Sequence, residues 1–155
     1  MQRLLFAIAF IAAAGPPVGA SAHEFIFYFR YDSTDAANPE WARHMARDTA
    51  CYARQASANR VHVVAHTDTA GSPEYNLALS RRRAEVVADL LVREGVPRER
   101  ISLEGRGEAA PAIASGDGVR EPLNRRATID VGFAPGPVAR CEGPTLPKLP
   151  QPSSR

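Results

Sequence analysis

One acid and one arginine stand out as the residues of this sequence that could bind a ligand. Asp68 lies in a short turn after an apolar stretch, and Arg83 lies in the long helical pattern that follows. Four apolar residues have the spacing of one helix face: Leu79, Val86, Val87 and Leu90. Arg83 falls on that same face, where an inward guanidinium is costly unless an anion pairs with it. We therefore expect Asp68 and Arg83 to lie together, each partly neutralising the other.

Catalytic and metal-binding groupings are weaker. Ser80, His66 and Asp68 have the residue types of a hydrolase triad, but Ser80 lies in a helical pattern without a Gly-x-Ser-x-Gly turn. His62 and His66 are four positions apart on a predicted strand, which separates them by roughly 13 Å, too far to share one ion. The two cysteines have no CxxC spacing. The sequence thus indicates neither an enzyme nor a metal site, and we expect no cofactor.

The helix that carries Arg83 has clear end signals. Ser72 is a typical N-cap, and Pro73 is well suited to the first helical position. Gly95 and Pro97 have the positions of a C-terminal stop. A strand is predicted at residues 60–66, so Asp68 follows the end of that strand. Ligands of α/β sheets commonly bind at such an end.

The remaining elements predict an α+β fold. Further strands are predicted at residues 24–31, 101–105 and 126–133, and a first helix runs from residue 38 to about 58. The resulting order, β-α-β-α-β-β, implies a mixed four-stranded sheet with helices on one face. The expected buried stripe of the first helix is Trp41, Met45, Tyr52 and Ala56. On the last strand, the expected core residues are Ala127, Ile129, Val131 and Phe133.

These features occur together with a long motif set. It comprises His66-Thr67-Asp68, Gly71, Tyr75-Asn76, Leu79-Ser80, Arg83-Ala84, Gly95-Val96, Arg100-Ile101, Gly105, Gly107-Glu108, Pro111 and Asn124-Arg125-Arg126. The set resembles the OmpA-like peptidoglycan-binding domain, the family of outer-membrane anchors and peptidoglycan-associated lipoproteins, over roughly residues 24–133. The resemblance implies that the last strand inserts between the first two.

The resemblance also implies a ligand, the meso-diaminopimelate of the peptidoglycan stem peptide. That side chain ends in an ammonium and a carboxylate. Asp68 matches the family's ammonium-binding acid, and Arg83 matches its carboxylate-binding arginine, whose planar fork suits a carboxylate. Further positions around the implied site are Asn76, Thr67, Arg126 and Asp32. Arg125 is expected to be solvated on the opposite face of its strand, and Arg30 replaces an acid that is usual in the family.

Three segments are predicted along the 155 residues. Residues 1–22 have the charged start, apolar run and small-residue site of a secretory signal peptide. Residues 23–133 form the domain, and residues 134–155 form a proline-rich tail. After signal removal we expect a periplasmic, cell-wall-associated chain that does not span the membrane and carries no lipid. The net charge of +2 favours neither nucleic acid nor an anionic membrane surface.

The predicted function is therefore non-catalytic binding of peptidoglycan through Asp68 and Arg83. The alternative is an envelope interaction protein that keeps the fold but docks another protein instead of the wall. Export to an oxidising compartment also favours a disulfide between Cys51 and Cys141. Cys51 lies off the predicted stripe of the first helix, and two free thiols remain the rival interpretation.

Overall fold

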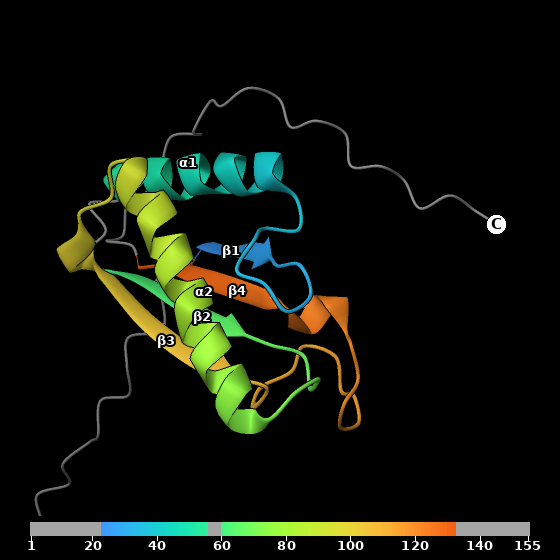
Figure 1. The fold of residues 1–155 in the computed structure, drawn as a ribbon. Coiled ribbons are helices and arrows are strands. Elements are labelled where there is room, and N and C mark those ends of the chain that lie inside the picture. Colours follow the sequence, from blue (N-terminus) through green and yellow to red (C-terminus); the bar gives the residue numbers. More distant parts are fainter. Residues whose placement is uncertain (1–22, 56–59, 133–155) are drawn as a thin grey trace, which may run out of the picture.

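Two helices cover one face of a four-stranded sheet (Figure 1). The computed structural model describes residues 23–55 and 60–132. The elements follow one another as β1 (His23–Tyr28), α1 (Pro39–Gln55), β2 (Val61–His66), α2 (Pro73–Arg93), the 3-10 turn η1 (Arg98–Arg100), β3 (Ile101–Gly107), the 3-10 turn η2 (Pro122–Asn124) and β4 (Arg126–Val131). This is the predicted α+β order.

The sheet has the strand order β1-β4-β2-β3. The last strand therefore lies between the first two, as the family resemblance implied. β4 is antiparallel to both neighbours, whereas β2 and β3 are parallel. The middle of the sheet thus holds β4 and β2, and the turns that follow β2 and precede β4 meet at one end of it. Asp68 and Arg125 belong to these two turns.

The core lies between the sheet and the helices. Alternate residues of the central strands face it and are fully buried, namely Val61, Val63 and Ala65 on β2 and Ala127, Ile129 and Val131 on β4. These are the predicted core residues of β4, apart from Phe133, which lies outside the described residues. β1 ends at Tyr28, three residues before the predicted end. The chain leaves the strand there because Phe29 makes only an isolated bridge, to Ala36.

The stripe predicted for α1 is shifted. Its buried residues are Ala42, Ala46, Thr49, Ala50 and Ala53, whereas Trp41, Met45 and Tyr52 are half-buried and Ala56 lies outside the described residues. Small side chains let the helix approach the sheet closely, so the larger ones pack along its flanks. The prediction erred because it weighted large apolar residues above alanine.

α2 keeps its predicted ends and packs tightly on β3. The Ser72 side chain accepts a hydrogen bond from the Tyr75 backbone, and Gly95 after the helix has φ +92°. At Gly105 a Cβ atom would lie 2.6–2.7 Å from atoms of Ser80 and Arg81, so glycine permits the contact. Ser80 Oγ accepts from the Gly107 N–H and donates to a helix carbonyl. Ser80 is therefore a packing residue.

Candidate functional site

Asp68 forms an ion pair with Arg125. The turn after β2 places the Asp68 carboxylate at 4% exposure, and its Oδ2 lies 3.0 Å from Arg125 Nη1. Arg125 was expected to be solvated, and this expectation is wrong. Its side chain is only 12% exposed, and its Nε donates to the Phe29 carbonyl at 3.3 Å. The reason is that Arg125 precedes β4 and belongs to the turn that follows η2, so the alternation of strand faces does not apply to it.

Arg83 is fully buried, but backbone carbonyls satisfy its guanidinium. Nε donates to the Ser33 carbonyl at 2.9 Å, Nη1 to the His66 carbonyl at 2.9 Å and Nη2 to the Arg30 carbonyl at 3.1 Å. Asp68 was expected to lie near Arg83 and partly neutralise it, and its carboxylate does favour the charged form of Arg83, but the ion pair that Asp68 makes is with Arg125. The carbonyl contacts join α2, the end of β2 and the segment 29–36 at one point.

The electrostatic surroundings of Arg83 are mixed. Burial lowers the pKa of its guanidinium to about 10, and the neighbouring Arg125 adds to this effect. Asp68 and Asp32 act in the opposite direction, because nearby carboxylates favour the charged form. Arg83 therefore remains a cation at neutral pH. Its guanidinium carbon also lies 4.9 Å from the centre of the Phe29 ring, within cation–π range.

Asp32 lies at the outer edge of this group of charges. It has φ +46°, which is rare for a residue other than glycine, and its side chain is exposed. Its Oδ1 accepts a hydrogen bond from the Tyr75 hydroxyl on the first turn of α2. This contact ties the segment 29–36 to α2 next to Arg83. Tyr75 was missed as a partner of Asp32, although it stands beside Asn76 in the quoted motif.

Asn76 and Thr67 lie behind the charged groups. Asn76 is 1% exposed and donates through Nδ2 to Glu108, which follows β3. Thr67 is equally buried, and its backbone N–H donates to the Gly107 carbonyl at 2.9 Å. The Thr67 hydroxyl has no hydrogen-bond partner among the described residues. Both residues thus support the turn that carries Asp68.

Arg126 lies on the other face of the sheet. Residues of β4 alternate, and Ala127 faces the helices, so Arg126 points away from them. It donates to the Ala110 carbonyl at 3.2 Å. It also lowers the pKa of His66, which reaches about 4 chiefly through burial. Arg126 was expected around the site, but Arg125 is the arginine that lies beside Asp68.

Several expectations fall on residues without a description. Cys141, the signal segment 1–22 and the tail 134–155 all lie outside the described residues, so the Cys51–Cys141 disulfide stays a prediction. Within residues 23–55 and 60–132, no cluster of three or more His, Cys, Asp or Glu side chains could hold a metal ion. In the same ranges, no helix combines the length and the apolar character needed to cross a membrane.

This geometry brings charged groups of both signs together at one end of the sheet. Two carboxylates, Asp68 and Asp32, and two guanidinium groups, Arg83 and Arg125, gather where the turn after β2 meets α2 and the segment 29–36. Charges of both signs held close together suit a zwitterionic or bidentate ligand.

The chain is similar in sequence to proteins named as outer membrane proteins and peptidoglycan-associated lipoproteins. It is 39% identical over 103 residues to a peptidoglycan-associated lipoprotein of Pseudomonas putida, with 66% of this chain and 60% of that protein covered. It is 32% identical over 114 residues to an outer membrane protein of Gluconacetobacter diazotrophicus, with 70% of this chain but 30% of that protein covered. The chain therefore spans less than two thirds of these relatives.

Solved structures give the same assignment. The peptidoglycan-associated lipoprotein from Burkholderia pseudomallei superposes with a TM-score of 0.61 at 28% identity, covering 69% of this chain and 88% of that one. The cell wall anchor of the type VI secretion system from Pseudomonas aeruginosa gives a TM-score of 0.57 at 25% identity, covering 74% and 88%. The family model for the OmpA family matches residues 28–125. The chain belongs to the OmpA family.

Proposed function

We propose that this chain is a non-catalytic, peptidoglycan-binding protein of the periplasm that binds the diaminopimelate of the stem peptide at Asp68 and Arg83. The observation that carries the proposal is a fully buried arginine cation held beside a carboxylate at the end of β2. A buried charge is costly unless it is paired, and buried charged groups gather at functional sites more often than elsewhere. Relatives whose names include peptidoglycan support the same ligand.

The donors and acceptors at the site match the ligand. Arg83 has five N–H donors and uses three of them on carbonyls, so two N–H groups remain for a ligand carboxylate. The ion pair with Arg125 engages Oδ2 of Asp68, which leaves Oδ1 for a ligand ammonium. Arg125 then balances the charge of Asp68 when the site is empty. Asn76, Thr67 and Asp32 complete the surroundings in this proposal.

Access to Arg83 requires a movement. Its side chain is fully buried under the carbonyls of Arg30 and Ser33, so a ligand carboxylate reaches it only if the segment 29–36 shifts. Asp32, which has a positive φ and accepts a hydrogen bond from the Tyr75 hydroxyl, lies in this segment next to Arg83.

Sedimentation with purified sacculi tests the proposal. Wild type should co-sediment with sacculi that contain diaminopimelate, and Asp68→Asn, which keeps the shape but removes the charge, should remain in the supernatant. Walls with lysine in place of diaminopimelate lack the terminal carboxylate, so binding to them should fall by about tenfold or more. Equal binding to both wall types would show that Arg83 does not read this carboxylate. Muropeptide release from the sacculi would contradict the non-catalytic assignment.

A further inference from the structure

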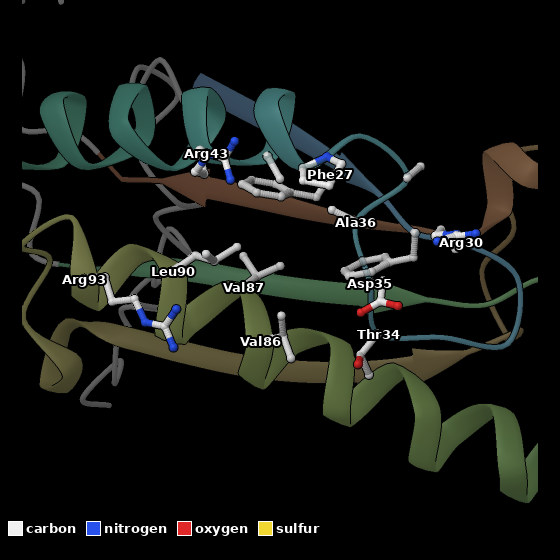
Figure 2. A pocket seen from close by; sticks show the side chains of 14 residues that line it. Phe27, Arg30, Thr34, Asp35, Ala36, Arg43, Val86, Val87, Leu90 and Arg93 are labelled. Atoms are coloured by element: carbon white, nitrogen blue, oxygen red, sulfur yellow. The ribbon is translucent and has the colours of Figure 1, made fainter.

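A concave surface lies between α1, α2 and the segment 29–36. It is a groove of about 490 Å³, within the range of ligand-binding clefts. Its floor is apolar and includes Phe27, Val86, Val87 and Leu90 (Figure 2). A smaller hollow of about 210 Å³ shares Phe27 and continues along the start of α1 to Trp41. Together they could receive one or two large apolar side chains.

The rim of the groove is basic. Arg43 of α1 and Arg93 of α2 lie toward one end, and Arg30 lies at the other, where Asp35 is the single acid of the lining (Figure 2). All three arginine residues are exposed. Within residues 23–55 and 60–132, no carboxylate lies at ion-pair distance from any of these guanidinium groups. The groove thus combines an apolar floor with positive charge at both ends.

We propose that this groove binds an acidic segment of a partner protein, with a large apolar side chain in the floor and acidic residues on both sides of it. The charge distribution selects this occupant. The chain's own segment 134–155 carries three cations, Arg140, Lys148 and Arg155, against one acid, Glu142, so it would be repelled by the rim. A single-chain anionic lipid has one head group and would leave the arginine at one end unpaired. An acidic peptide pairs with both ends.

This binding is separate from the proposed wall function. The groove and the wall site share only the segment 29–36, and neither Arg43 nor Arg93 contacts Asp68, Arg83 or Arg125 in the described part of the chain. The two sites use different charged residues, although a shift of the segment 29–36 on wall binding would also change the lining of the groove. The two activities can be removed independently, so failure of one proposal is distinguishable from failure of the other.

The experiment uses three synthetic peptides that share a Leu-Phe-Leu core. Three aspartates, three lysines or three serines flank this core on each side. Each peptide is titrated into the full, 15N-labelled protein, and amide chemical shifts are followed. The aspartate peptide should shift the resonances of Ala36, Ala37 and Leu90 in a saturable manner. The effect should weaken from 50 to 500 mM NaCl, because salt screens exposed charges. The lysine peptide should leave these resonances unchanged.

Charge-reversal variants make the test specific. Arg93→Glu and, as a second variant, Arg43→Glu should each lower the affinity for the aspartate peptide by about fivefold or more. Each substitution replaces an attraction between charges by a repulsion. Arg100→Glu makes the same change in net charge at an exposed residue of η1 outside the groove. This variant should bind the aspartate peptide as wild type does. Both groove variants should still co-sediment with sacculi.

Three results would overturn the proposal. The first is no shift at the groove with the aspartate peptide at millimolar concentration. The second is an equal effect of the lysine and aspartate peptides. The third is tighter binding of dodecanoate than of the aspartate peptide at the same resonances, which would assign the groove to a lipid.

Discussion

Asp68 and Arg125 form the ion pair of the candidate site, with Oδ2 and Nη1 3.0 Å apart and both side chains largely shielded from water. The two residues come from the turns that flank the central strands β2 and β4. This pairing makes Asp68 serve two purposes in our proposal, as a partner of Arg125 in the empty site and as an acceptor for the ligand. The two purposes can be separated by mutation.

The first prediction separates the structural role of Asp68 from its binding role. Arg125→Ala should lower the free energy of unfolding by about 3 kcal/mol, because it leaves the carboxylate of Asp68 shielded and unpaired. The same variant should still bind sacculi, since Asp68 and Arg83 remain. Asp68→Asn should lose binding at a similar cost in stability. Urea unfolding and co-sedimentation of both variants provide the measurements. If Arg125→Ala loses sacculus binding while folded and Asp68→Asn retains it, the ligand acid is misassigned.

The second prediction concerns the three carbonyls held by Arg83. A lysine at this position keeps the charge but cannot reach the Ser33, His66 and Arg30 carbonyls together. We expect Arg83→Lys to cost about 3 kcal/mol in the free energy of unfolding, on the scale of one or two lost charge-assisted hydrogen bonds. It should also abolish sacculus binding.

The neighbouring arginine provides the control for this substitution. Arg82 is exposed, so Arg82→Lys should change neither the stability nor the sacculus binding. If Arg83→Lys unfolds at the same urea midpoint as wild type, Arg83 does not hold α2 and the segment 29–36 together.

Local signals predicted much of the fold. The proline and serine at the start of α2, and the glycine at its end, have clear preferences that tertiary contacts did not override. The helical spacing also placed Arg83 on the buried face, where it is fully buried. The position of β4 between β1 and β2 came from the family resemblance, because strand spacing along the chain does not determine which strands pair.

The partners of the charged residues could not be read from the sequence. Arg83 is satisfied by carbonyls, and the direction of a carbonyl in the segment 29–36 depends on the tertiary fold, not on residue type. The start of β4 at Arg126 and the faces of that strand were predicted correctly. Arg125 precedes the strand and follows η2, so its direction is set by that turn and not by the alternation of strand faces.

The third prediction is the disulfide between Cys51 and Cys141. Cys51 is half-buried on α1, off the buried stripe of alanines. Closing a loop of about 90 residues should stabilise the chain by about 4 kcal/mol in the chain-entropy model. Intact mass of protein prepared from the periplasm without reductant, before and after thiol alkylation, should show no alkylated cysteine. Two alkylated cysteines in the unreduced sample would contradict the bridge.

The last prediction is a loss of stability in mild acid through His66. The pKa of His66 is lowered from 6.5 to about 4, chiefly by burial and also by the charges of Arg126 and Arg106, while Glu104 acts in the opposite direction. The folded state thus keeps the imidazole neutral, whereas the unfolded chain takes up a proton near pH 6.5. The contribution of His66 to the free energy of unfolding is therefore fully present above pH 6.5. It is lost as the pH falls toward 4, by an amount on the order of 3 kcal/mol.

The pH effect is measured by comparison with a residue that does not titrate. His66→Gln should be less stable than wild type at pH 7.5 and should lose less stability than wild type between pH 6.5 and 4.5 in urea unfolding. The carboxylates that titrate in this range are present in both proteins, so the difference between the two curves reports His66. His62→Gln is the matched control, because His62 is half-buried on the same strand, next to Glu104. Parallel curves for wild type and His66→Gln would mean that the sheet face beside Arg126 tolerates a charged imidazole.

The turn that carries Asp68 begins directly after His66, so a charge at this position should disturb the candidate site as well. Sacculus binding should accordingly weaken in wild type over the same pH interval, and to a smaller extent in His66→Gln.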